Sequence, residues 1–184
     1  MGNETAQALL QRISEGDEAA FADFYRLFEK RLYHFIKQKL NDPFEAADIL
    51  NETLLEVWRK AGTFEGRSKV STWLFGIAYF KTVDRLRKNG KLIVDSDSIP
   101  EQVDESANAM ACLLSKENGV HIQYCLETLK LAHRTVIELA FLEDMPYGEI
   151  AQIVECPENT VKTRMFHAKQ LMKNCLSARL GGTA

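Results

Sequence analysis

Residues 145–172, MPYGEIAQIVECPENTVKTRMFHAKQLM, carry the most specific local pattern in this chain of 184 residues. Pro146 suits the start of a short helix whose apolar residues share one face. Glu155-Cys156-Pro157 breaks the chain, and Glu158 or Asn159 can cap a second, longer helix. A short helix, a three-residue turn and a longer basic helix together predict a helix-turn-helix.

The second helix of this motif divides into an apolar and a polar face. Spacings of four, three, four and three place five residues on the apolar face: Val161, Met165, Ala168, Met172 and Cys175. Small polar groups, a ring and flanking lysines on the opposite face suit base edges and phosphates. The alternative is an ordinary surface helix whose Phe166 packs on the first domain or on an oligomer partner. We favour DNA, and the candidate contacts are Asn159, Thr160, Lys162, Thr163, Arg164, Phe166, His167 and Lys169.

The first half of the chain also has a helical pattern. One broad apolar stripe, from about residue 19 to 40, is formed by Phe21, Phe24, Phe28, Leu32, Phe35 and Ile36. Asn41-Asp42-Pro43 interrupts it, and a second amphipathic helix follows through Trp58. A third helix runs from Trp73 to Leu86, with Trp73 and Phe75 as its first candidates for the core. No stretch alternates with period two for long, so the predicted fold class is all-α.

Charge is segregated along the chain although its net value is only −3. Residues 59–91 carry nine basic and two acidic side chains, and residues 159–184 carry five basic and no acidic ones. Residues 92–118, with six acidic and one basic, are polar and poor in aromatics, as flexible linkers are. Two basic blocks separated by an acidic stretch suggest two contacts with a polyanion. We predict two small helical domains, residues 1–90 and 119–178, joined by a flexible acidic linker at 91–118.

The sequence argues against an enzyme and against a membrane protein. It holds no P-loop, no GxSxG and no HExxH, so we expect no catalytic site, cofactor or small-molecule substrate. Its apolar runs are too short to span a bilayer and it begins without a secretory signal, so we expect a cytoplasmic protein. Cys112, Cys125, Cys156 and Cys175 form no CxxC pair, which predicts reduced thiols packed as small hydrophobes. His121 and Cys125, four residues apart, are the one hint of a metal site, and we favour burial over ligation.

Two motifs in the first half resemble a known family. DILNETLLEVW at 48–58 and FEGRSKVSTWLFGIA at 64–78, followed by Asp84 and Arg87, resemble bacterial extracytoplasmic-function (ECF) sigma factors of the sigma-70 family. Their pattern is an acidic-polar helix, a Phe-containing loop and a Thr-Trp-Leu helix with a basic end. The helix-turn-helix looks like the second domain of that family, which reads the −35 promoter element. The resemblance covers most of residues 8–178.

The resemblance implies a non-enzymatic transcription initiation factor that binds core RNA polymerase and promoter DNA. The polymerase would be bound through the clamp helices of its largest subunit and through its flap, and the positions matching the clamp-binding surface are Asp48, Asn51, Glu52 and Leu55. Aromatic groups beside positive charge suit unpaired bases, and the loop 64–70 would hold a flipped −10 base. The candidate −10 contacts are Phe64, Arg67, Ser68, Lys69, Tyr79, Phe80, Lys81, Asp84, Arg85, Arg87 and Lys88.

The chain departs from the family pattern at three places, and one rival function stays open. Phe80 stands where members usually carry Asn, Gly76 where many carry Arg, and Leu129-Lys130 replaces the usual Leu-Pro. The family also implies an anti-sigma partner that occludes both binding surfaces until a stress or envelope signal arrives. Such a partner would hold the protein at the membrane if it is itself a membrane protein. The rival is a self-sufficient helix-turn-helix regulator whose helical first domain senses a ligand or dimerises. It would bind a palindromic operator without polymerase. A weaker alternative is an adaptor whose first domain only binds protein.

Overall fold

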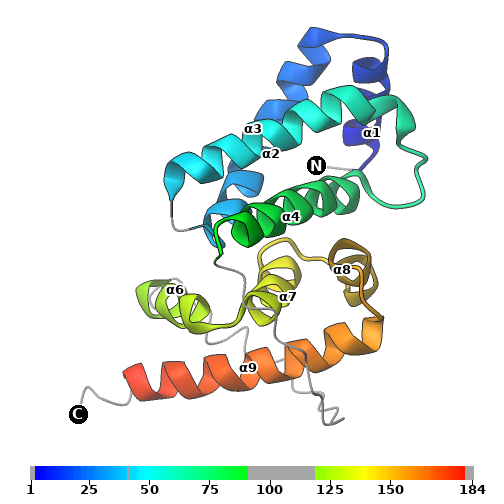
Figure 1. The fold of residues 1–184 in the computed structure, drawn as a ribbon. Coiled ribbons are helices and arrows are strands. Elements are labelled where there is room, and N and C mark those ends of the chain that lie inside the picture. The colour runs from blue at the N-terminus through cyan, green and yellow to red at the C-terminus, as the bar shows by residue number, and fades with distance from the viewer. Residues whose placement is uncertain (1–2, 41, 91–118, 181–184) are drawn as a thin grey trace. The chain divides into compact units, whose positions relative to one another are not determined.

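The computed structural model describes residues 3–40, 42–90 and 119–180, and in these ranges the chain is helical without strands. The predicted all-α fold class is therefore confirmed. The chain divides into two compact units, the first built from helices α1–α4 and the second from α6–α9 (Figure 1). The predicted linker, residues 91–118, lies outside the described residues.

The first unit packs four helices around one core: α1 (Asn3–Ser14), α2 (Glu18–Lys37), α3 (Pro43–Lys60) and α4 (Val70–Lys88), with a 3-10 turn, η1 (Ala61–Thr63), after α3. Aspartates start two of them. Asp17 accepts a hydrogen bond from the Ala20 amide, and Asp42 accepts from the amides of Phe44 and Glu45, with Pro43 at the first helical position. Such caps satisfy amides that have no partner inside the helix.

The aromatic stripe of α2 forms the centre of the first unit, as its spacing predicts. All its members but Phe21 are buried, and Phe21 meets Trp58 with ring centroids 5.3 Å apart. Phe75 of α4 is fully buried and packs against Phe35, with ring centroids 5.1 Å apart. Trp73 is only half-buried, so its prediction as a core residue is wrong. It sits in the first turn of α4, beside the loop that precedes the helix.

The second unit contains the predicted helix-turn-helix. Its helices are α6 (Gly119–Thr128), α7 (Leu131–Phe141), α8 (Tyr147–Val154) and α9 (Glu158–Leu180), and α9 is the long helix along which α6 and α7 pack (Figure 1). Between α8 and α9, Glu155 adopts a left-handed conformation with φ of 48° and ends α8. The carbonyl of Pro157 accepts from the amides of Thr160 and Val161, so Pro157 takes the cap position that was predicted for Glu158 or Asn159.

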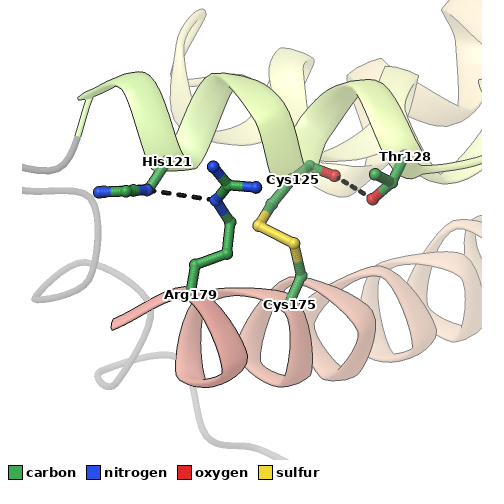
Figure 2. Close-up of a disulfide and its surroundings, with 5 residues drawn as sticks. All are labelled: His121, Cys125, Thr128, Cys175 and Arg179. Carbon is green, nitrogen blue, oxygen red and sulfur yellow. Dashed lines mark hydrogen bonds between the residues drawn. A yellow bond between two sulfur atoms is a disulfide. The ribbon is translucent and has the colours of Figure 1, made fainter. Parts of the chain in front are cut away.

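A disulfide joins the two ends of the second unit, contrary to the prediction of reduced thiols. Cys125 of α6 is bonded to Cys175 of α9, 50 positions later in the sequence, and their Cα atoms are 5.8 Å apart (Figure 2). The packing of α6 on α9 brings these distant positions together. Cys125 therefore carries no thiolate for a metal, and His121 instead accepts a hydrogen bond from Arg179. Cys156 forms no disulfide with another described residue, and Cys112 lies outside the described residues.

None of the described helices combines the length and the apolar character needed to cross a bilayer.

We predict that reduction of the Cys125–Cys175 bond destabilises the second unit. Closing a loop of 50 residues restricts the unfolded chain and is worth about 4 kcal/mol in the chain-entropy model. Thermal unfolding of the full chain, followed by circular dichroism with and without reductant, should show a transition that moves to lower temperature on reduction. The double variant Cys125→Ala/Cys175→Ala should unfold near the temperature of the reduced parent, and adding reductant should not change that temperature. Equal melting of the oxidised and reduced chains would contradict the prediction.

Candidate functional site

The outer face of α3 brings together the four residues predicted to bind polymerase. Asp48, Asn51, Glu52 and Leu55 are all exposed, and Leu55 leaves half of its surface in solvent. On the inner face of the same helix Ile49, Leu50, Thr53, Leu54 and Val57 are buried. The 3.6-residue period thus separates a core-facing from a solvent-facing stripe on one helix.

Ion pairs connect α3 with α4 and involve two of the cations predicted to bind −10 DNA. The half-buried Arg85 guanidinium donates a hydrogen bond of 3.2 Å to the Glu52 carboxylate. It also forms an ion pair with the Glu45 carboxylate, with nitrogen and oxygen 3.8 Å apart. Lys81 lies 3.8 Å from Glu56, and the pKa of Glu56 is held below its ordinary value mainly by the hydrogen bond from Lys60. The charges of Lys81 and Arg85 are therefore partly matched by acids of α3.

The last turn of α4 is more open. Arg87 and Lys88 are exposed and lie 4.0 Å and 3.0 Å from Asp84. The Lys88 ammonium also lowers the pKa of Asp84 through its hydrogen bond. Because exposed pairs of this kind contribute little to stability, a phosphate can compete for both cations.

A small pocket lies in the loop between η1 and α4. It has a volume of about 180 Å³ and is lined by Thr63, Phe64, Glu65, Arg67, Ser68 and Trp73. The rings of Phe64 and Trp73 are 5.3 Å apart, and Gly66 turns the loop with φ of +69°. Arg67 is exposed and pairs with Glu65 at 2.6 Å. The pocket thus combines flat aromatic walls with one charge of each sign at its edge.

The other predicted −10 residues follow the exposed side of α4. Lys69 precedes the helix and is exposed, while Tyr79 is half-buried and contacts Phe80 with ring centroids 5.4 Å apart. Phe80 leaves 42% of its surface in solvent, which makes it available to a ligand. At Gly76 an added Cβ would meet no atom within 4 Å, so the fold does not require glycine at this position.

Helix α9 presents the predicted DNA contacts on one side. Its buried face consists of Val161, Met165, Ala168, Met172 and Leu176, with Cys175 half-buried in the disulfide beside them. None of the eight predicted contacts is buried: Asn159 and Lys162 are exposed and the others are half-buried. The predicted division of the helix into two faces is therefore correct, with Leu176 as the position that the prediction missed.

Several contacts orient the polar side of α9. Arg164 donates to the sulfur of Cys156 at 3.7 Å, and Lys162 pairs with Glu158 at 3.0 Å. The hydroxyl of Thr163 donates to the Asn159 carbonyl, which leaves its lone pairs to accept a further bond. Burial raises the pKa of Tyr147 in α8, and nearby Lys162 opposes that rise. Most of this side of the helix is thus constrained by neighbours within the unit.

Sequence reasoning missed residues whose role depends on packing. Glu45 and Glu56 are the acids that hold Arg85 and Lys81, and no local pattern marks them. Trp73 is a wall of the pocket, although its apolar character suggested the core. No cluster of three or more histidine, cysteine or acidic side chains that could hold a metal ion occurs in the described parts of the chain.

Family models match both units. Sigma-70 region 2 matches residues 24–92, and Sigma-70 region 4 matches residues 120–172. Among curated proteins, the ECF RNA polymerase sigma factor SigK of Mycobacterium tuberculosis is 30% identical, over 92% of both chains. The chain belongs to the ECF group of the sigma-70 family. The sigma-H factor of Pseudomonas aeruginosa is 27% identical, over 96% of each chain.

A solved structure agrees with this membership. The sigma factor RpoE of Bartonella quintana, in complex with the anti-sigma factor NepR, superimposes with a TM-score of 0.66 at 25% identity, covering 85% of this sigma factor and 96% of that chain.

We predict that two kinds of α9 variant behave differently on DNA. Lys162→Ala and Lys169→Ala should weaken binding to all −35 sequences alike and reduce the salt slope by about one unit each, because a lysine contacts phosphate. Thr163→Ala and His167→Ala should instead cost about 1–3 kcal/mol on the favoured site only. Binding to a randomised −35 library at several salt concentrations measures both effects. Lys30→Ala, in the other unit, is the control, and uniform behaviour of all four variants would contradict the orientation of α9.

Proposed function

We propose that this sigma factor directs core RNA polymerase to promoters with two elements and helps to open the −10 region. The first unit, within the predicted domain 1–90, binds polymerase and the −10 element, and the second, within 119–178, binds the −35 element. The observation that carries the proposal is that each unit exposes groups suited to nucleic acid: the aromatic pocket beside Phe64 and Trp73, and the polar side of α9. As an initiation factor, the protein binds and positions its partners and catalyses no reaction.

The polar side of α9 suits the major groove of the −35 element. Its exposed and half-buried side chains combine three cations with two hydroxyls, an amide, an imidazole and the ring of Phe166. Cations fix the register on phosphates, while hydroxyl, amide and ring groups distinguish base edges. We assign the −35 contacts to the eight predicted residues of this helix.

The loop pocket suits one unpaired base of the −10 element. Its volume of about 180 Å³ is below the roughly 300–1,000 Å³ of pockets for drug-sized ligands, so it fits a single flat group. Phe64 and Trp73 supply stacking surfaces, and Arg67 lies where a backbone phosphate would pass. A base held here cannot return to its stack, and this favours the open duplex.

The partner on α3 is the clamp-helix pair of the polymerase largest subunit, and the flap is the partner of the second unit. The Asp48 side chain makes no ion pair or hydrogen bond with any other described residue, so its carboxylate is available to a basic partner. An anti-sigma factor is a further partner, since RpoE has been solved in complex with one. Such control is suited to a stress or envelope response, with the sigma factor in the cytoplasm.

We predict that Asp48→Lys prevents assembly with core enzyme. Placing a lysine against a basic partner surface costs several kcal/mol, so affinity should fall at least about a hundredfold. Promoter-directed run-off transcription should be lost with it, while DNA binding through α9 is unchanged. The readouts are fluorescence anisotropy of the labelled chain titrated with core enzyme, and run-off transcription.

Glu15→Lys is the control, since it reverses an exposed charge of the same unit, in the turn after α1. Unchanged core affinity of Asp48→Lys would overturn the assignment of α3 and favour the free-standing regulator.

A further inference from the structure

Phe44, in the first turn of α3, leaves 81% of its surface in solvent. Its backbone is fixed, because Pro43 starts the helix and the Asp42 carboxylate accepts the Phe44 amide at 2.8 Å. A large aromatic side chain thus projects into water from a fixed backbone position, where it adds nothing to the core. Single exposed apolar residues are common, so position must decide whether this one has a role.

The helical period places Phe44 on the same stripe as the residues assigned to polymerase. Positions 44, 48, 51 and 55 succeed one another by four, three and four residues, which is the spacing of one helix face. All four are exposed. The stripe extends about 16 Å from Phe44 to Leu55, with polar groups between its two apolar ends. Aromatic anchors beside polar groups are the usual composition of energetic hot spots in interfaces.

The charge of the stripe restricts what can cover it. Its middle holds Asp48 and Glu52, and only Glu52 has a cation of the same unit beside it. Nucleic acid and anionic lipid are repelled by these carboxylates. A second copy related by a two-fold axis would bring the acidic middle of one stripe onto that of the other, which is unfavourable. The occupant is therefore an elongated basic protein surface with an apolar recess at one end.

We infer that Phe44 is an additional anchor of the core-polymerase interface. Its ring inserts into an apolar recess of the polymerase, one helical turn before the basic residue that pairs with Asp48. This inference rests on the proposed function and extends the clamp-binding surface beyond its predicted positions by one turn. The interface then has two apolar ends, Phe44 and Leu55, which exclude water from the charge pairs between them. Phe44 fixes the register of α3 along its partner.

The test compares core-enzyme affinity of Phe44→Ala and Phe44→Leu in the full chain. Phe44→Ala should weaken binding about tenfold to hundredfold, as expected for the loss of a buried aromatic side chain. Phe44→Leu should retain most of the parent's affinity for core enzyme, because leucine is also large and apolar. Both variants should melt as the parent does, because the side chain is exposed. Glu15→Lys again serves as the control, since Glu15 is exposed in the same unit as Phe44 and belongs to no assigned surface.

The outcomes separate this inference from the proposed function. Normal affinity of Phe44→Ala, with Asp48→Lys defective, would overturn the Phe44 anchor and leave the assignment of α3 intact. Normal affinity of both variants would overturn both. A parent chain that dimerises in analytical ultracentrifugation, with Phe44→Ala monomeric and unaltered in core binding, would assign the stripe to a second copy and likewise overturn the inference.

Discussion

The packing of the α2 aromatic stripe against α3 and α4 is the constraint on which the first unit depends. Phe24 and Phe28 lie with ring centroids 4.7 Å apart, and Phe35 meets the fully buried Phe75 of α4. Each buried aromatic side chain contributes about 1.5–3 kcal/mol, which is a large share of the stability of a small domain. Because this core covers the inner face of α3, only the outer face of that helix is exposed and open to the proposed partner.

Electrostatics give α3 a second role. Glu45, Glu52 and Glu56 point toward the cations of α4, whereas Asp48 has no such neighbour in the described residues. The pairs of Arg85 with Glu45 and Glu52 are 3.8 Å and 3.2 Å long, so these acids hold the guanidinium in place at the position proposed to contact DNA. One helix thus orients the cations beside the proposed DNA site and presents the surface proposed to bind polymerase. The proposed docking and melting surfaces are neighbours within a single small unit.

The sequence predicted those features that depend on local spacing and missed those that depend on packing. The helix-turn-helix and the buried face of α9 follow from a 3.6-residue period and a short break, which neighbouring residues alone specify. Helix α1 was not predicted, because Ala6, Leu10 and Ile13 are too few apolar positions to stand out. The Cys125–Cys175 disulfide joins positions 50 residues apart, and no sequence motif marks such a pair. The same reason hides the ion pairs between α3 and α4. The site assignments remain predictions, since exposure shows only that these residues are accessible.

The central claim is that promoter recognition and opening require this chain and core polymerase together. The most direct test is permanganate footprinting of a promoter that this sigma factor uses. Such a promoter is first identified by run-off transcription of genomic DNA with the reconstituted holoenzyme. The account predicts reactive −10 thymines only when both proteins are present. The chain alone should bind weakly and with strong salt dependence, because each of its DNA surfaces is small. Specific nanomolar binding by the chain alone at physiological salt, with no gain in affinity or thymine reactivity on adding core enzyme, would contradict the account.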